Sequence, residues 1–431
     1  MEQLFPFWKQ FSKKVMGMSE LPKDWVETTL GEVATISSSK RIFHSDYVTS
    51  GIPFYRSKEV IERQKGNDIS TALFITEKKF NEIKSKFGAP EKDDLLLTSV
   101  GTLGVPYLVK SNEIFYFKDG NLTWFRKYNG LNPNYIYHFF LSLIGKERLN
   151  EITIGSTQSA LTISGLKNIN INLPPLDEQK SIADILSSFD DKIELLREQN
   201  KTLETLAQTL FKEWFVKFNF PNAIGEMTNS ELGQIPKGWR VGALGDVTNI
   251  KGGGTPSTKN KIFWNGNIHW TSPKDLSNSK SMFLLDTEKK ITEQGLKKIS
   301  SGLLPKGTLL LSSRAPIGYL AFSDVDIAIN QGYIALLGDE FFSNYFMYLW
   351  LKVNMKSVMN AANGSTFLEI SKTAFKGIQC LVPNENTLSL FDELVKTNFD
   401  KILSNQLQIQ TLEKTRDALL PKLMSGNIRV N

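Results

Sequence analysis

Residue types that bind polyanions gather in the turns of this 431-residue chain. Residues 250–300 hold nine lysines against four acidic residues, and "KGGGTPSTK" (251–259) mixes lysine with glycine and hydroxyl residues. Lysine and arginine neutralise phosphates, whereas hydroxyl and amide side chains in turns donate to phosphates or base edges. The net charge of +6 permits such binding. It does not establish it, because a solvated lysine-rich surface has the same composition.

The chain shows no catalytic or cofactor-binding motif. We find no G-x-x-x-x-G-K-[ST] phosphate loop, no G-x-G-x-x-G turn, no Asn-Pro-Pro-aromatic sequence, no H-E-x-x-H and no G-x-S-x-G. Three distant histidines and one cysteine, Cys380, give no zinc spacing. Cys380 is expected to pack as a small apolar residue. A binding module therefore explains the chain better than an enzyme does.

The elements that would position these residues occur twice. "LPKDWVETTLGEVATI" (21–36) is echoed by "IPKGWRVGALGDVTNI" (235–250), and "DDLLLTSVGTLG" (93–104) by "GTLLLSSRAPIG" (307–318), both 214 positions apart. "GSTQSALTISGLKNI" (155–169) and "GSTFLEISKTAFKGI" (364–378) are 209 apart. Solenoid periods run to only ~20–50 residues. The sequence therefore predicts two copies of a whole domain.

Each copy reads as a β-rich α/β (α+β) domain. Short apolar segments alternate with Gly, Pro, Asn and Ser, and the Leu-Leu-Leu runs suit strands buried on both faces. One amphipathic helix is expected in each copy, at 135–152 and 345–362. Trp25 and Trp239 are expected in the two cores, and Phe211, Trp214 and Phe215 are expected to pack near the end of a helix.

A long helix is predicted after each domain. No Gly or Pro occurs between Asp177, the expected N-cap, and Lys217, and apolar residues recur there in steps of four and three. This heptad pattern indicates a coiled coil, and residues 387–424 carry a weaker seam in phase with it. Asn398, Asn405 and Arg416 interrupt the weaker seam, either to fix its register or because the coil opens to solvent there. The seam residues are Leu186, Phe189, Ile193, Leu196, Asn200, Leu203, Leu210, Val395, Ile402, Ile409, Leu412 and Leu419.

The simplest assembly pairs the two helices antiparallel within one chain. Two similar domains would then be joined by a long two-helix coiled coil with pseudo-two-fold symmetry. The expected boundaries are an N-terminal extension (1–20), a first domain (21–175), a central helix (176–217), a loop connector (218–234), a second domain (235–385) and a C-terminal helix (386–426). No apolar run approaches the ~18–20 residues of a membrane span. The single cysteine, Cys380, fits a reducing cytosol, so a cytoplasmic location is expected.

The ordered motifs carry a family resemblance. The two entry segments, "GGTPS" (253–257), "RAPIG" (314–318), "NQG" (330–332), "LPPLDEQ" (173–179) and "SELGQIPKGW" (230–239) resemble the DNA-specificity subunit of type I restriction-modification systems. The likeness covers residues 20–428, and its specificity comes from the duplicated order rather than from any single motif.

The resemblance implies a non-catalytic subunit in which each domain reads one half of an asymmetric, bipartite target in double-stranded DNA. The helices would set the spacer and dock two methyltransferase subunits, through which motor-nuclease restriction subunits join. This subunit would need no cofactor or metal. S-adenosylmethionine, ATP and Mg²⁺ would serve its partners, and the complex would be an adenine-DNA methyltransferase and restriction endonuclease.

The resemblance turns the polar and basic turn residues into candidates for DNA contact. Val100 stands where Arg314 does, "DGN" (119–121) stands where "NQG" does, and "SSSKRIFHSD" (37–46) replaces the "GGTPS" turn, so the two domains should read different half-sites. The candidates are Lys40, Arg41, Arg56, Ser57, Lys58, Ser99 and Gln158 in the first domain, and Lys251, Thr255, Ser257, Lys259, Thr271, Lys274, Ser313, Arg314 and Gln331 in the second.

Two other functions remain compatible with the sequence. The chain could direct a methyltransferase alone, without a nuclease partner. It could also be a coiled-coil scaffold that binds no DNA, although basic, polar stretches at matched places in both domains speak against this.

Overall fold

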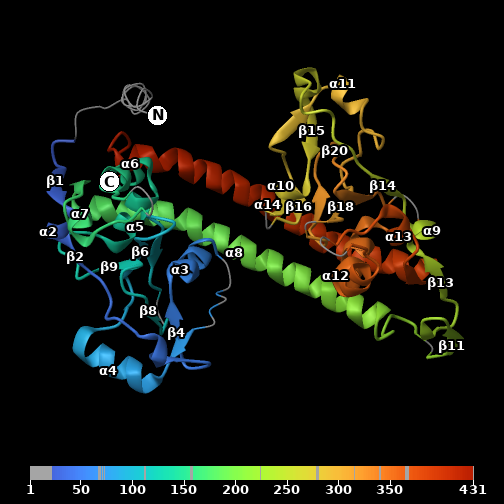
Figure 1. The fold of residues 1–431 in the computed structure, drawn as a ribbon, viewed down its shortest axis with the longest axis horizontal. Helices are drawn as coiled ribbons and strands as arrows, with labels where there is room; N and C mark the ends of the chain where they lie inside the picture. Colours follow the sequence, from blue (N-terminus) through green and yellow to red (C-terminus); the bar gives the residue numbers. More distant parts are fainter. Residues whose placement is uncertain are drawn as a thin grey trace. The chain divides into compact units, whose positions relative to one another are not determined.

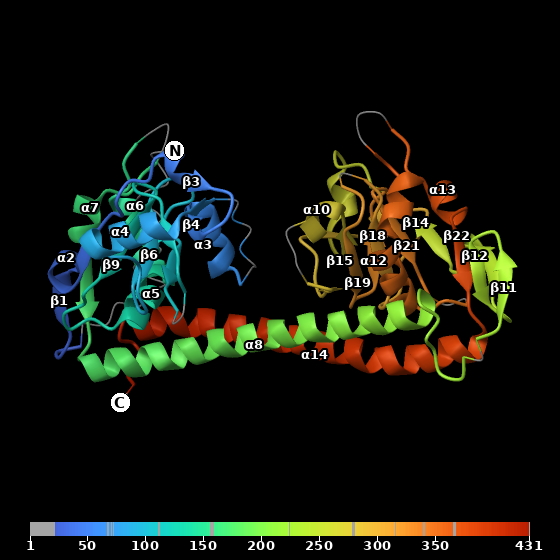
Figure 2. The ribbon, with the colours of Figure 1, turned by 90° about the horizontal axis from the view of Figure 1, so that it is seen from below.

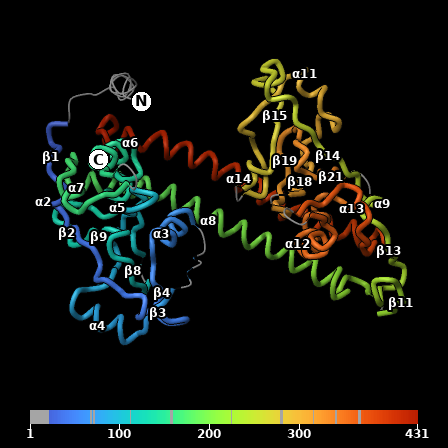
Figure 3. The backbone as a smooth tube through the Cα atoms, in the orientation of Figure 1, coloured from blue at the N-terminus to red at the C-terminus, as the bar shows by residue number. Residues whose placement is uncertain are grey.

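The computed structural model describes residues 22–430 except 67–68, 70, 72, 111–112, 156–158, 224, 278–280, 315, 339–340 and 365–367. The expected N-terminal extension (1–20) and Gln158 therefore lie outside the described residues. The chain divides into two compact units, Met1–Glu194 with Thr411–Asn431, and Leu195–Gln410. The path of each unit can be followed in Figures 1 and 3.

The first strand of the first domain pairs with its last strand. Strand β1 (Val26–Thr29) pairs antiparallel with β10 (Asn170–Leu173), the last strand before the long helix. Helix α2 (Leu30–Val33) follows β1 and contacts α7 (Ile163–Lys167). Trp25 is buried in this core, as predicted.

Two four-stranded sheets build the rest of the first domain. One has the order β2 (Thr35–Ser37), β9 (Leu122–Arg126), β6 (Leu95–Thr98) and β7 (Pro106–Leu108). The other has the order β3 (Tyr47–Val48), β5 (Phe74–Ile75), β4 (Ile52–Tyr55) and β8 (Tyr116–Phe117), with β4 and β8 parallel. All of β6 is buried, as its Leu-Leu-Leu run predicts. Helices α3 (Ser57–Gln64) and α4 (Glu77–Phe87) and the short turn η1 (His44–Asp46) complete this part.

The single helix predicted at 135–152 is two helices. Helix α5 (Pro133–Leu141) ends at Ser142, whose extended backbone also starts α6 (Leu143–Glu151). The Ser142 hydroxyl donates to the Phe139 carbonyl and accepts from the Gly145 amide, so it caps both helices. Sequence periodicity continues across this break, which is why the pattern read as one helix.

The second unit repeats this plan with longer strands. Its entry strand β13 (Arg240–Ala243) pairs with β22 (Gln379–Val382) and leads into α9 (Leu244–Val247). The buried sheet has the order β14 (Ile250–Gly252), β21 (Tyr333–Leu336), β18 (Leu309–Ser312), β19 (Leu320–Ser323) and β16 (Phe283–Leu284). Trp239 is buried in this core, as predicted.

A second, three-stranded sheet carries the matching parallel pair. Its order is β17 (Lys289–Ile291), β15 (Trp264–Thr271) and β20 (Ile327–Ile329), with β15 and β20 parallel. Short helices α10 (Pro273–Ser277), α11 (Glu293–Leu296) and α13 (Lys372–Lys376) and the turn η2 (Lys261–Phe263) flank the sheets. Helix α12 (Asn344–Asn360) is continuous apart from a kink at Asn354, in line with the predicted 345–362.

The connector between the first long helix and the second domain is more than a loop. Strands β11 (Met227–Ser230) and β12 (Gly233–Pro236) form an antiparallel hairpin inside the predicted loop 218–234 and just beyond it. The turn at 231–232 is closed by Ser230, whose hydroxyl donates to the Gly233 carbonyl. The loop prediction is therefore wrong for this part, because polar strands lack the apolar alternation that marks a strand in sequence.

The two long helices are α8 (Leu176–Phe215) and α14 (Glu385–Met424), each of 40 residues. Helix α8 begins at Leu176, so Asp177 lies in its first turn and is not the N-cap that we predicted. In the first unit Asp190 of α8 binds Arg416 of α14 at 2.6 Å, and Ile182 packs in one cluster with Leu423. The helix segments of this unit therefore run antiparallel.

The second unit contains the other half of each long helix, again antiparallel. Asn200 bonds to Asn405, and the Trp214 ring lies 5.6 Å from that of Phe391. These segments can be followed in Figure 2. Phe211, Trp214 and Phe215 pack in the core here, as predicted. All twelve predicted seam side chains are buried or partly buried.

Glutamine side chains join each domain to a long helix. In the first unit Gln179 accepts from the Asn132 amide and donates to the carbonyls of Gly130 and Pro174. In the second unit Gln406, which is buried, bonds to both the amide and the carbonyl of Phe283 at a sheet edge. Within the described part of the chain, no helix is long and apolar enough to cross a membrane.

Candidate nucleic-acid interface

The parallel strand pair of each domain ends in the same backbone arrangement. In the first domain the Lys118 amide, just after β8, donates to the Tyr55 carbonyl at the end of β4. In the second domain the Asn330 amide, just after β20, donates to the Thr271 carbonyl at the end of β15. The carboxyl ends of parallel strands share one edge of a sheet, so each domain gathers its following turns there.

A short helix with a lysine in its first turn leaves that edge in both domains. The amide of Arg56 donates to Glu59 at 2.8 Å, and the amide of Ser272 donates to Asp275 at 2.7 Å. These carboxylates hold the start of α3 and of α10 in the same way. Lys58 and Lys274 each lie two residues after the capped amide, and thus occupy matching places.

A second set of matching backbone hydrogen bonds, which we call the frame, lies beside these helix starts. The amides of Ser99 and Ser313 donate to Asn121 and Gly332, each at 2.8 Å. In return, the Ser99 carbonyl accepts from Leu161 and the Ser313 carbonyl accepts from Ile370. The next residues form isolated bridges, which join Val100 to Ala160 in the first domain and Arg314 to Glu369 in the second. We call these residues the bridge pairs.

A third matched contact joins the turn after the second strand of each domain to the turn after the parallel pair. In the first domain Arg41 Nε donates to Asp119 at 2.9 Å. In the second domain Thr255 Oγ1 donates to Gln331 Oε1 at 2.6 Å. Asp119 follows Lys118 as Gln331 follows Asn330. We call these residues the turn pairs.

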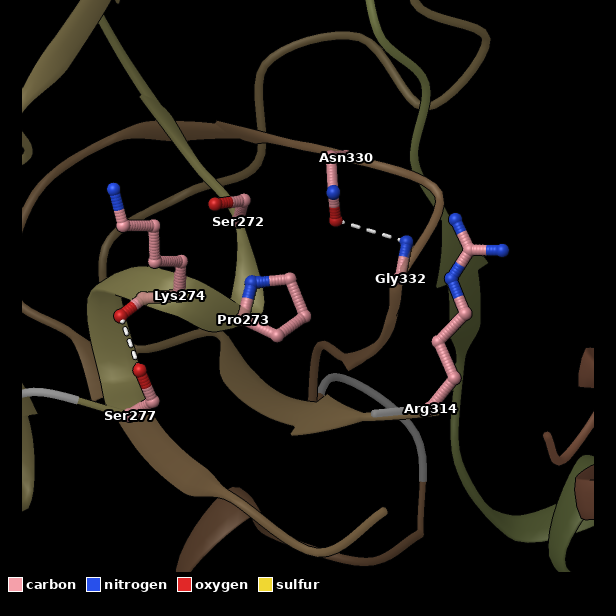
Figure 4. Close-up of a pocket in the computed structure, with 7 residues that line it drawn as sticks. All are labelled: Ser272, Pro273, Lys274, Ser277, Arg314, Asn330 and Gly332. Carbon is pink, nitrogen blue, oxygen red and sulfur yellow. Dashed lines mark hydrogen bonds between the residues drawn. The ribbon is translucent and has the colours of Figure 1, made fainter. Parts of the chain in front are cut away.

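The second domain has an open hollow at this edge. It measures about 360 Å³ and is lined by Ser272, Pro273, Lys274, Ser277, Arg314, Asn330 and Gly332. Figure 4 shows the Lys274 ammonium and the Arg314 guanidinium on opposite sides, with Pro273 between them. The Asn330 side chain is fixed by the Gly332 amide at 2.8 Å. Two cations flanking an open concavity suit an anionic polymer better than an enclosed small molecule.

The structure thus brings several sequence-predicted residues together. Lys274 and Arg314 share the hollow, Thr255 contacts Gln331, and Lys58 and Arg41 hold the corresponding places in the first domain. Lys40 lies over the Phe87 ring at 5.0 Å, while Lys251 and Lys259 are exposed. Three others contribute to the turns: Ser57 donates to the Asn121 carbonyl, the Ser257 carbonyl accepts from Trp264, and Arg56 binds Glu59. The bond to Glu59 raises the pKa of the Arg56 guanidinium, so this cation is engaged inside its own domain.

Three candidates are buried, which removes them from direct contact. Ser99 is 2% exposed and shares its hydroxyl with Thr123, and Thr271 is fully buried with its hydroxyl on Asp275. Ser313 is 3% exposed. Ser99 and Ser313 follow the buried strands β6 and β18, and Thr271 is one of the two buried residues that end β15, so all three support the domain structure itself. Burial therefore argues against a direct side-chain contact with DNA at these three residues, and the contact stays a prediction.

Two residues at the edge were missed from the sequence. Asp119 and Glu369 are the acidic members of a turn pair and a bridge pair. Acidic residues were passed over because a polyanion repels them. The only sequence signal was their place inside motifs that align between the two copies.

Comparisons with known proteins agree with this duplicated organisation. The family model described as "Type I restriction modification DNA specificity domain" matches residues 22–205 and again 236–417. The chain is 31% identical over 428 residues to the type I restriction enzyme MjaIX specificity subunit of Methanocaldococcus jannaschii, covering 97% of this chain and 96% of that protein.

A more distant relative and a solved structure extend the likeness. The HindI specificity subunit of Haemophilus influenzae is 25% identical over 474 residues, covering 94% of this chain and all of that protein. The crystal structure of the S subunit of a type I restriction-modification system from M. genitalium superposes with a TM-score of 0.58 at 17% identity. That match covers 94% of this chain and 98% of the other, and it supports a shared fold.

Proposed function

This chain belongs to the type I restriction-modification DNA specificity family, and on that premise we propose that it selects the target of such a complex. Each domain reads one half of a bipartite, asymmetric site in double-stranded DNA. The chain itself carries out neither methyl transfer nor cleavage.

One observation carries this proposal: the two domains repeat a backbone frame but change the side chains that it presents. Backbone hydrogen bonds around Ser99 and Ser313 match one for one, whereas the adjoining residues are Val100 and Arg314. Folding does not require the side chains to differ, because the same frame would be equally stable with the same side chains in both domains. Two unlike readers on one chain suit a target whose halves differ.

Positioning and reading are divided among different side chains at the edge. Lys274, on the first turn of a short helix, contacts a phosphate and sets the orientation of its domain; Lys58 has the matching place in the first domain, where Glu62 lies 3.5 Å from its ammonium. The bridge and turn pairs meet base edges, which alone carry sequence. Lysine suits the first role because its ammonium is a compact point charge that needs no fixed geometry.

The paired long helices set the spacer and bind the partner subunits. A 40-residue helix is roughly 60 Å long. Two half-sites on one face of the duplex lie about one turn, or ~34 Å, apart. Two methyltransferase subunits dock on the helices and bring in the motor-nuclease subunits. S-adenosylmethionine, ATP and Mg²⁺ act in those partners, and the complex works in the cytoplasm.

Methylome sequencing of the host with and without this gene tests the proposal. We expect one bipartite motif to vanish with the gene and to return with a plasmid copy. A methylome that does not change contradicts a role in target selection. Loss of methylation without loss of restriction, or the reverse, separates a methyltransferase-only system from a complete one.

Inserting one heptad into both long helices tests the spacer. The insertion keeps the a/d seam in phase and lengthens the coil by roughly 10 Å at ~1.5 Å per residue. We expect both half-sites to be kept and the unread gap between them to grow by about three base pairs at ~3.4 Å per pair. A variant that methylates sites with the original gap excludes a ruler made from these helices.

A further inference from the structure

The bridge pairs and turn pairs differ between the domains in a reciprocal way. The first domain has a charged turn pair, Arg41–Asp119, and an apolar bridge pair, Val100–Ala160. The second domain reverses this, with an uncharged turn pair, Thr255–Gln331, and a charged bridge pair, Arg314–Glu369. At these matched positions each domain therefore carries one ion pair, and the two ion pairs occupy exchanged places.

Resting on the proposed function, we propose that these pairs determine sequence specificity and that each ion pair reads a G·C base pair. In the major groove, guanine presents two acceptors, O6 and N7, and cytosine presents the N4 amino donor. An arginine fork donates to both guanine acceptors, and a neighbouring carboxylate accepts from cytosine. Arg314–Glu369 and Arg41–Asp119 supply that set of donors and acceptors.

The acidic partner argues against an ordinary phosphate contact. A carboxylate beside the guanidinium repels a phosphate, whereas at a base edge it adds an acceptor. Arg314 Nη1 lies 3.6 Å from Glu369, longer than a good hydrogen bond, and both side chains remain well exposed, at 38% and 47%. The pair is thus oriented and still free to receive a partner.

Folding gives little reason for either ion pair. Exposed ion pairs contribute little to stability, and the frame beneath Arg314 is held by backbone hydrogen bonds between Ser313 and Ile370 and between Asn363 and Glu369. The first domain has the same backbone bonds, from Ser99 to Leu161 and from Ile154 to Ala160, with no charge above them. The bridge ion pair is therefore dispensable for its frame, and the second domain makes the turn contact without charge, through Thr255 and Gln331, which leaves recognition as the role of the charges.

The uncharged pairs fit the other base pair. The Gln331 amide matches the N6 and N7 atoms of adenine, and the Val100 methyls suit the thymine methyl group. Each half-site would then contain one G·C and one A·T pair at the contacted positions. Their order in the second half-site is the reverse of that in the first.

Charge-conserving variants test the inference in the full chain, co-purified with its methyltransferase partner. Arg314→Lys keeps the positive charge but loses the fork that grips guanine at two points. Arg41→Lys does the same in the first domain, and Arg240→Lys, at an exposed arginine in the separate β13–β22 sheet, is the control. A pool of random DNA duplexes is the probe, and the enriched sequences are read for each variant.

We expect Arg314→Lys to lower discrimination at one G·C position of one half-site by roughly 5- to 150-fold, the range for a lost bidentate base contact. Arg41→Lys should do so in the other half-site only, and Arg240→Lys in neither. Circular dichroism melting checks that all three variants fold.

Three results would overturn the inference. In the first, the wild-type complex enriches a bipartite sequence and the Arg314→Lys complex enriches the same sequence with equal discrimination. Another is loss of discrimination in both half-sites together. These two leave the proposed function intact. A wild-type complex that enriches no sequence overturns the proposed function as well.

Discussion

The buried amide pair in the second unit makes a quantitative prediction about the long helices. Asn405 of α14 is fully buried and donates to Asn200 of α8 at 2.9 Å, while its own carbonyl oxygen has no hydrogen-bond partner. Sequence alone left open whether such residues face solvent or fix the register, and the burial of Asn405 favours the second explanation. A polar layer inside a seam lowers stability and makes other registers worse still.

Replacing Asn405 with leucine should therefore stabilise the second unit. Removing the unpaired carbonyl recovers about 1–3 kcal/mol, and burying a leucine side chain adds ~1.5–3 kcal/mol. The lost bond to Asn200 costs ~0.5–1.5 kcal/mol, and fitting the larger side chain costs ~1–3 kcal/mol. The net expectation is about 1–2 kcal/mol of added stability. For a unit of this size that corresponds to a rise in Tm of roughly 2–8 °C.

Differential scanning calorimetry of the full chain measures this change. Asn200→Leu is the matched control. It removes a hydrogen-bond acceptor from the buried Asn405 amide, so it should lower Tm where Asn405→Leu raises it. We further expect Asn405→Leu to loosen the register, which methylome sequencing would report as methylated sites with more than one gap length. A lower Tm for Asn405→Leu, or equal shifts for both variants, refutes the reasoning.

Three further predictions come from other buried or edge residues. Burial, with the Arg416 charge, lowers the pKa of His138 to about 3, so below pH 6.5 this imidazole binds a proton in the unfolded chain but stays neutral in the folded chain. Stability should therefore fall by up to ~1.4 kcal/mol per pH unit below about pH 6.5; urea unfolding of wild type and His138→Gln should show a shallower fall in the variant. Gln406→Ala leaves the Phe283 amide and carbonyl unpaired and should lower the unfolding free energy of the second unit by ~1–3 kcal/mol in the same assay. Lys274→Ala should weaken binding of all duplexes alike and reduce the salt slope by about one, where a sequence-dependent loss would instead make Lys274 a base reader.

The strongest periodic signals in the sequence were the most reliable. The heptad of α8 predicted a helix from Asp177 to Lys217 where the structure has Leu176–Phe215, because burial in a seam repeats every seven residues and is visible locally. The Leu-Leu-Leu runs likewise predicted the buried strands β6 and β18. The helix break at Ser142 could not be predicted, because the apolar pattern continues across it and a single serine hydroxyl caps the helix there.

The edge residues could be predicted only in part. The copies align well enough to match Val100 with Arg314, but Lys58 and Lys274 are 216 positions apart, so a constant offset of 214 does not pair them. Their equivalence follows from the strands that precede them. Ser99 and Ser313 looked like surface residues, because a hydroxyl after a leucine run gives no sign of burial. Asp119 and Glu369 lie in motifs that align between the copies, but their contacts with Arg41 and Arg314 join segments that are distant in sequence.

The frame beneath the bridge pairs is made from main-chain atoms alone. The amides and carbonyls of Ser313, Asn363, Glu369 and Ile370 form its hydrogen bonds, and every residue type except proline supplies those groups. Substituting an exposed side chain on such a frame changes stability by little, usually within about 0.5 kcal/mol. Point mutations at the bridge pair can therefore change the preferred DNA sequence without a prior stabilising mutation. The fold stays the same while the preferred sequence changes over evolution.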